Sequence, residues 1–162
     1  MPSHDQICRT IIHERKVCIL IPTYNNAGTL SRVLDGCLFY TKNIIVVDDG
    51  SSDGTNSILK RYDDITVIHH AVNQGKGMAI KTGFDAAMAS GYRYAVTIDS
   101  DGQHLPADLP YLINGLLNHP DSIIIGSRNM NRAGIPGKSS FGNRFSNFWF
   151  RFDTGIDLPD TQ

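Results

Sequence analysis

Short apolar runs alternate along the chain with longer segments in which apolar residues recur at helical spacing. The apolar runs predict strands at residues 16–21, 43–47, 65–70, 93–98 and 122–125. The periodic segments predict helices at residues 27–40, 53–62, 77–90 and 109–118. Residues 1–15 show no clear period, so we expect a loose lead-in before a domain over residues 16–162. Because repeated strand-helix units place successive strands in parallel, we expect an α/β fold with a mainly parallel sheet flanked by helices.

The loops that follow the predicted strands are polar and rich in turn-forming residues. They cover residues 22–26, 48–55, 71–77 and 99–103. In a parallel sheet these loops emerge at the same edge, where open α/β sheets place their ligands. We therefore expect the loops to form one crevice.

Two carboxylates, Asp99 and Asp101, directly follow the predicted strand at residues 93–98. Carboxylate oxygens are hard donors that suit Mg²⁺ or Mn²⁺, and such ions keep positions open for substrate phosphates. The alternative is a simple turn in which Asp101 and Gly102 reverse the chain. The acidic pair alone leaves both interpretations open.

A second acidic pair, Asp48 and Asp49, directly follows the predicted strand at residues 43–47. A carboxylate at this place can accept the ring N–H of uracil or guanine, and the pair does not choose between these bases. Residues 75–77 have the sequence Gly-Lys-Gly and lie at the start of the predicted helix at residues 77–90. Backbone amides at a helix start, together with Lys76, could bind a phosphate.

Composition limits the classes of function. A chain of 162 residues with 41% hydrophobic residues suits one domain with a real core. The formal net charge of −1 argues against a nucleic-acid partner. Cys8, Cys18 and Cys37 lack metal-ligand spacing, so we expect reduced, structural thiols in a cytosolic setting. No stretch approaches the roughly 20 apolar residues of a membrane span.

The segment 122–152 carries basic residues and no acidic one. Its basic residues are Arg128, Arg132, Lys138, Arg144 and Arg151. Such a cluster can pair with a phosphate-bearing acceptor, and the alternative is a solvated basic surface. Aromatic residues at helical spacing predict an amphipathic helix over residues 139–152. That helix could pack on the sheet or lie at a membrane surface.

Several motifs, taken in order, resemble those of family 2 glycosyltransferases, and among these the polyprenyl-phosphate sugar transferases such as dolichyl-phosphate mannose synthase. They lie at residues 17–25, 46–55, 73–77, 99–104 and 126–128. The resemblance implies a GT-A fold and inverting transfer of a hexose from a UDP- or GDP-sugar donor. The implied acceptor is a polyprenyl phosphate or a saccharide. The implied setting is cell-envelope polysaccharide synthesis in the cytoplasm, at the inner face of the membrane.

The resemblance also implies roles for individual residues. Those implied to bind the donor are Pro22, Thr23, Tyr24, Asp48, Asp49, Lys76 and Asp99. Those implied to hold Mg²⁺ or Mn²⁺ are Asp99, Asp101 and Gln103. Those implied to take part in catalysis are Asp101, Arg128, Arg144 and Asp160. The chain departs from the family pattern at Asn26, where many relatives have Glu.

The sequence leaves two alternative functions open, and it also predicts that the C-terminal part is incomplete. A haloacid dehalogenase-like phosphatase also uses Asp-x-Asp after a strand, but on its first strand and with Thr or Val at the place of Gln103. A non-catalytic nucleotide-sugar-binding module is the second alternative. Residues 158–162 resemble the start of a family motif that continues through Gly-Phe-Arg, so we expect a truncated C-terminal part.

Overall fold

The computed structural model describes residues 2–126 and contains a four-stranded parallel sheet in the order β3-β2-β1-β4. The strands are β1 (Val17–Thr23), β2 (Ile44–Asp48), β3 (Thr66–His69) and β4 (Tyr94–Thr97). The helices are α1 (His4–Glu14), α2 (Leu30–Leu38), α3 (Thr55–Leu59), α4 (Lys76–Ala89), the 3-10 turn η1 (Pro106–Asp108) and α5 (Leu109–Asn118). The expected α/β fold with a parallel sheet is confirmed.

The strand order reverses at β1. The chain runs outward from β1 to β2 and β3, and then returns to place β4 on the other side of β1. In the register, Ile19 lies opposite Ile44 on β2 and Val96 on β4. In open α/β sheets, ligands bind beside such a reversal, at the carboxyl ends of the strands. The topology therefore directs attention to the ends of β1 and β4.

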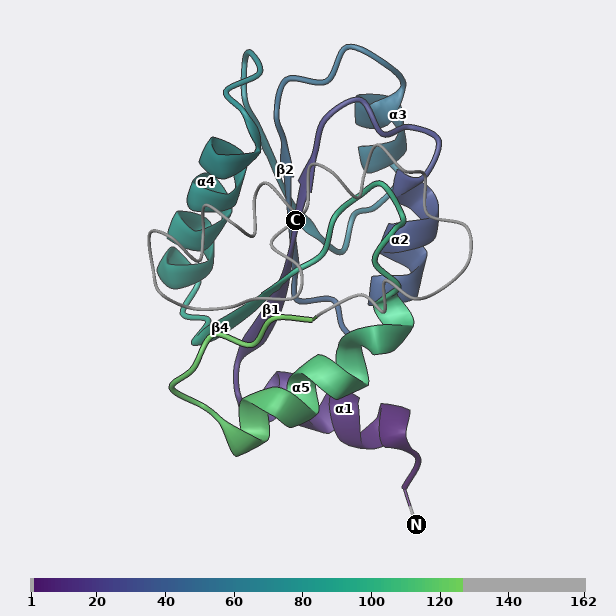
Figure 1. Cartoon of the computed structure of the whole chain (residues 1–162). Helices are drawn as coiled ribbons and strands as arrows, with labels where there is room; N and C mark the ends of the chain where they lie inside the picture. The colour runs from purple at the N-terminus through teal and green to yellow at the C-terminus, as the bar shows by residue number, and fades with distance from the viewer. Residues whose placement is uncertain (1, 127–162) are drawn as a thin grey trace, which may run out of the picture. The chain divides into compact units, whose positions relative to one another are not determined.

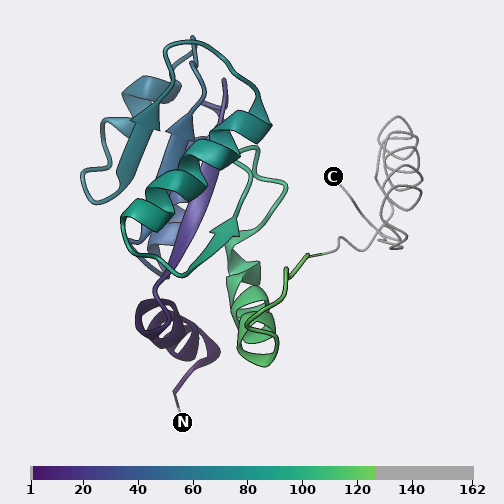
Figure 2. The ribbon, with the colours of Figure 1, turned by 90° about the vertical axis from the view of Figure 1, so that its left-hand side faces the viewer.

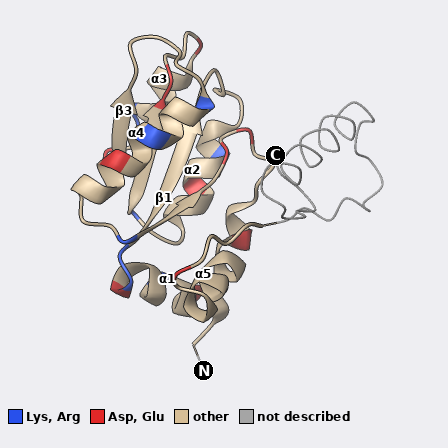
Figure 3. Cartoon of the chain, turned by 60° about the vertical axis from the view of Figure 1, so that its left-hand side comes forward, with Lys and Arg blue, Asp and Glu red and all other residues tan. Residues whose placement is uncertain are grey.

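Helices cover both faces of the sheet (Figures 1 and 2). Helix α4 packs against β1 and β2 on one face, and the other helices contribute to the second face. Side chains alternate along β1, so Leu20 points to the α4 side while Ile19 and Ile21 point to the other core. All of β1 is buried and uncharged (Figure 3). This rigid central strand positions the loop that follows it.

The contact between α4 and the sheet is unusually close because the helix presents small residues. Ala79, Gly83 and Ala87 recur every fourth residue and are buried. A Cβ atom added at Gly83 would collide with the Leu20 side chain. The first turn of α4, which carries Lys76, is thereby held near the end of β1.

The N-terminal segment is a helix, not the loose lead-in expected from its pattern. Ser3 and Gln6 form a capping box, with the backbone N–H of Gln6 donating to Ser3 Oγ (3.2 Å) and the backbone N–H of Ser3 donating to Gln6 Oε1 (2.9 Å). Cys8 and Ile12 lie on the buried face of α1. The Ser-x-x-Gln spacing was the available sequence signal for this helix.

Residues 122–125, which were expected to form a strand, carry no helix or strand in the described part of the chain. The chain divides into two units, residues 1–122 and 123–162, and the helices and strands named above belong to the first.

The cysteines are free and buried, as expected for structural thiols. Burial raises the pKa of the Cys37 thiol to about 12, so this group stays protonated and unreactive at neutral pH. Within residues 2–126, no helix combines the length and apolar character needed to cross a bilayer.

Candidate functional site

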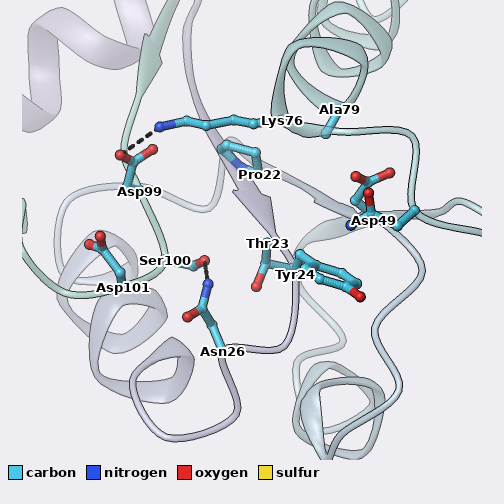
Figure 4. Close-up of a pocket in the computed structure, with 11 residues that line it drawn as sticks. Pro22, Thr23, Tyr24, Asn26, Asp49, Lys76, Ala79, Asp99, Ser100 and Asp101 are labelled. Carbon is cyan, nitrogen blue, oxygen red and sulfur yellow. Dashed lines mark hydrogen bonds and ion pairs between the residues drawn. The ribbon is translucent and has the colours of Figure 1, made fainter. Parts of the chain in front are cut away.

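A cavity of about 250 Å³ opens at the carboxyl ends of β1 and β4, beside the reversal of strand order. Its lining comes from all the loops that the sequence predicted to converge (Figure 4). The lining residues are Pro22, Thr23, Tyr24, Asn26, Asp49, Asn73, Lys76, Ala79, Asp99, Ser100 and Asp101. The structure thus brings most of the residues expected to bind the donor around one space.

The loop after β4 is anchored through Ser100, which is buried between the two aspartates. The Ser100 hydroxyl accepts a hydrogen bond from Asn26 Nδ2 (2.7 Å), and its carbonyl accepts one from the Thr29 hydroxyl (2.7 Å). Figure 4 shows Ser100 turned toward Asn26, while Asp99 and Asp101 lie on the same side of the cavity. Asn26, the departure from the family pattern, therefore positions the acidic loop.

Asp101 combines the two interpretations left open by the sequence. Its Oδ1 accepts the Gln103 backbone N–H (2.8 Å), which closes a tight turn. The residue is nevertheless exposed and lines the cavity. A turn and a ligand position are therefore compatible at this residue.

Lys76 spans the cavity and pairs with Asp99. Its Nζ lies 2.8 Å from Asp99 Oδ2, and the ring of His104 lies further away, with Nδ1 at 3.8 Å from the same oxygen. The Lys76 side chain is 59% exposed, and an exposed pair contributes at most about 1 kcal/mol. Lys76 can therefore leave Asp99 for a bound phosphate at small cost.

Asp49 is held by a dense set of hydrogen bonds. Its Oδ1 accepts the Gln74 N–H (2.9 Å) and contacts His70 Nδ1 (2.7 Å), while its Oδ2 accepts the Gly75 N–H (2.8 Å). Burial by itself would raise the pKa of this carboxyl, but the bonds from Gln74, His70 and Gly75 outweigh it and lower the pKa. Asp49 is therefore an ionised, immobile acceptor at the cavity wall.

Asp48 has a different environment from its neighbour. Its Oδ1 accepts the Ser51 N–H (3.1 Å), and its Oδ2 lies 3.1 Å from His69 Nδ1. It is not among the residues that line the cavity. Of the two residues in the acidic pair, Asp49 is the one that lines the cavity.

Thr23 ends β1 with a buried hydroxyl that has no hydrogen-bond partner within the described part of the chain. The residue is 2% exposed and lines the cavity beside Pro22 and Tyr24. An unpaired buried hydroxyl costs about 1–3 kcal/mol. A ligand that bonded this oxygen would remove that cost.

The loops after β1 and β2 are fastened to each other. The Asn25 N–H donates to Ser51 Oγ (2.9 Å), and Asn25 Oδ1 accepts the Ser52 N–H (2.8 Å). Asp53 accepts the N–H groups of Ala27 (3.1 Å) and Thr55 (2.9 Å). Its hydrogen bonds to Thr55 are the main reason that its pKa is lowered. These contacts make the cavity wall rigid before a ligand arrives.

The carboxylate oxygens at the cavity are suitable ligands for a divalent cation. Asp99 and Asp101 supply carboxylate oxygens, the ligands that Mg²⁺ and Mn²⁺ prefer. Within residues 2–126, no group of three or more His, Cys, Asp or Glu side chains is gathered to hold a metal by itself. A cation bound here would take its remaining ligands from phosphate oxygens and water, as Mg²⁺ commonly does.

Some of the predicted site residues lie outside the described part of the chain, and some residues at the site were not predicted. Arg128, Arg144, Asp160 and the segment 139–152 lie outside the described residues. Sequence reasoning missed the anchoring by Ser100 and the contact of His70 with Asp49. The available signal for His70 was its position at the end of the predicted strand at residues 65–70, at the edge of the sheet where the polar loops begin.

The fold and the cavity define a class of protein. A polar, charged cavity beside a strand-order reversal in a parallel α/β sheet is where such domains bind nucleotides. The chain belongs to glycosyl transferase family 2, whose family model matches residues 18–157. The resemblance drawn from the motifs is confirmed.

Relatives of known activity support the same subgroup. The chain is 31% identical over 163 residues to polyprenol monophosphomannose synthase of Mycolicibacterium smegmatis, covering 93% of this chain and 60% of that protein. It is 32% identical over 132 residues to UDP-N-acetylglucosamine–dolichyl-phosphate N-acetylglucosaminyltransferase of Methanococcus voltae, covering 71% of this chain and 53% of that protein. The chain therefore spans little more than half the length of these relatives.

Solved structures confirm the GT-A fold. Glucosyl-3-phosphoglycerate synthase of Mycobacterium tuberculosis superposes with a TM-score of 0.58 at 24% identity, over 72% of this chain and 45% of that chain. The M. tuberculosis synthase has also been solved with Mn²⁺ and UDP bound.

Proposed function

We propose that this chain is the donor-binding part of a metal-dependent, inverting hexosyltransferase. It transfers a sugar from a nucleoside diphosphate to a polyprenyl phosphate. The observation that carries the proposal is the convergence of Thr23, Asp49, Lys76 and the Asp99–Asp101 loop on one cavity. The M. smegmatis and M. voltae relatives, whose names specify polyprenol and dolichyl phosphate, support a lipid phosphate over a saccharide as acceptor.

Each part of the cavity suits one part of a nucleotide sugar. Asp49, at the end of β2, would accept a base N–H, and Thr23 would bond the nucleoside with its unpaired hydroxyl. Lys76 would exchange its contact with Asp99 for the diphosphate. Asp99 and Asp101, with Gln103 as a further predicted ligand, would hold Mg²⁺ or Mn²⁺ against the same phosphates.

The transfer itself requires little proton chemistry. An acceptor phosphate oxygen, already ionised at neutral pH, would attack the anomeric carbon while the bond to the nucleoside diphosphate breaks. The metal, when bound, supplies Lewis-acid stabilisation of the departing diphosphate. Arg128 and Arg144 would pair with the acceptor phosphate, and Asp160 would lie near it. A lipid-linked acceptor would bring the chain to a membrane surface.

Thermal unfolding with UDP-glucose, UDP-N-acetylglucosamine and GDP-mannose, each with and without MnCl₂, tests donor binding. A donor at about 100 times its Kd stabilises a protein by about 2.7 kcal/mol, which is a rise of roughly 5–10 °C in Tm for this chain length. We expect that rise with Mn²⁺ and its loss in Asp101→Asn. Asp108→Asn, an exposed carboxylate away from the cavity, is the matched control. No rise with any donor would refute the proposal.

A non-catalytic binding module predicts the same thermal shift but no product. The separating measurement is transfer of radiolabelled sugar to undecaprenyl phosphate. Product formation that requires Asp101 supports the enzyme, and donor binding without product, even in a full-length protein, favours the module. The phosphatase alternative loses its basis, because the aspartates follow β4 and not β1.

A further inference from the structure

We propose that the base of the donor is uracil, because His70 and two backbone amides leave Asp49 able to accept a single further hydrogen bond. The inference rests on the proposed function, since it concerns the same cavity. It chooses between the two bases that the acidic pair alone left open.

The lone pairs of the Asp49 carboxylate limit how many hydrogen bonds this side chain can accept. An ionised carboxylate offers about four acceptor positions, two on each oxygen. Oδ1 of Asp49 already accepts from the Gln74 N–H and from His70 Nδ1, and Oδ2 accepts from the Gly75 N–H. With respect to residues 2–126, one position therefore remains, on Oδ2. The Asp49 side chain is only 3% exposed, and the residue lines the cavity.

His70 is the side chain that fills the second position on Oδ1. Because the Asp49 carboxylate only accepts, His70 Nδ1 must carry the hydrogen of their 2.7 Å contact. In the neutral ring, Nε2 is then an acceptor, and it lies 3.0 Å from the Thr82 hydroxyl on α4. The ring is 8% exposed and bonded at both nitrogens, so its position is defined. His70 is thus a positioning residue for the base.

The bases differ in the edge they would present to Asp49. Uracil offers one ring N–H, at N3, between two carbonyl oxygens. Guanine offers N1–H beside the N2 amino group, and this pair of donors needs two acceptor positions in a row. Cytosine places an unprotonated N3 beside its amino group, and that nitrogen would repel the carboxylate. A single remaining acceptor position matches the uracil edge.

Thr23 adds a second contact of the right kind. The Asp49 N–H donates to the Thr23 carbonyl (2.9 Å), so the two residues are neighbours across β1 and β2. The Thr23 hydroxyl is buried at the same cavity and unpaired among the described residues. It can donate to a uracil carbonyl that flanks N3–H. Asp49 and Thr23 together would therefore recognise an N–H donor beside a carbonyl acceptor, which is the edge that uracil presents.

Calorimetric titration of the chain with UDP, GDP and CDP in the same excess of MgCl₂ tests the inference. A buried donor left without an acceptor weakens binding by roughly tenfold or more, so we expect UDP to bind at least about tenfold more tightly than GDP and CDP. In His70→Phe, the position on Oδ1 becomes available, and the preference over GDP should fall severalfold. His69→Phe, whose ring contacts Asp48 away from the cavity, is the control and should keep the preference.

The outcomes separate the inference from the proposed function. GDP or CDP binding as tightly as UDP to the unmodified chain would overturn the choice of uracil while leaving donor binding intact. No binding of any nucleotide would overturn both. An unchanged preference in a folded His70→Phe, as judged by circular dichroism, would remove His70 from the account. The measurement on the unmodified chain decides the base even where His70→Phe fails to fold.

Discussion

Gly50 tests whether the loops after β2 and β3 must touch to build the cavity. Its φ is +74°, and an added Cβ would lie 2.6 Å from the carbonyl carbon of Val72 and 2.7 Å from the amide nitrogen of Asn73. A left-handed conformation costs a non-glycine residue about 1–2 kcal/mol. Steric overpacking costs about 1–3 kcal/mol more, and backbone atoms cannot rotate away as a side chain can. We expect Gly50→Ala to lower the free energy of unfolding by roughly 2–5 kcal/mol.

Gly91 supplies the matched control for this substitution. Its φ is +77°, but an added Cβ meets nothing within 4 Å. Gly91→Ala should therefore show only the conformational cost of about 1–2 kcal/mol. Urea unfolding followed by circular dichroism measures both variants. Equal losses in the two variants would refute the steric contact, because the crowding around Gly50 would then have no energetic effect.

Three further predictions follow from the site. Thr23→Val should keep or raise the free energy of unfolding while weakening UDP binding severalfold in calorimetry, because the hydroxyl is unpaired; a clear loss of stability contradicts this. Lys76→Met should change stability by less than about 1 kcal/mol but weaken UDP binding about tenfold; unchanged binding contradicts a phosphate contact. The folded-state pKa of Asp49 lies below its unfolded value of 3.8, so its ionised form contributes stability above that pH, and the contribution disappears as pH falls through the folded pKa. Urea unfolding between pH 6 and pH 3 should therefore be less steeply pH-dependent in Asp49→Asn, and equal slopes would contradict the assignment.

The sheet was predictable from the sequence because its strands are short apolar runs that end in polar loops. Parallel order requires the loops to converge, so the sequence alone predicts that Asp49, Lys76 and Asp99 lie at one edge, as the cavity lining shows. The α1 helix was missed because polar residues outnumber apolar ones in this segment, although its apolar residues recur at helical spacing and a capping box marks its start. Within the described residues, the segment 122–125 forms no strand, because an apolar run alone does not specify a pairing partner.

Side-chain partners were the part that the sequence could not supply. Spacing alone did not separate Asp48 from Asp49, yet one lines the cavity and the other contacts His69. The role of Ser100 depends on Asn26, which lies 74 residues earlier in the chain. Such long-range contacts depend on the packing of β1 against its neighbours, which no local pattern encodes.

The central claim is that the cavity beside the reversal at β1 binds the donor nucleotide together with a divalent cation. A crystal structure of the chain with UDP and MnCl₂, with anomalous data for manganese, tests it most directly. The account predicts the base beside Thr23 and Asp49 and an anomalous peak at the carboxylates of Asp99 and Asp101. Nucleotide bound elsewhere on the chain, or manganese away from these carboxylates, would contradict it.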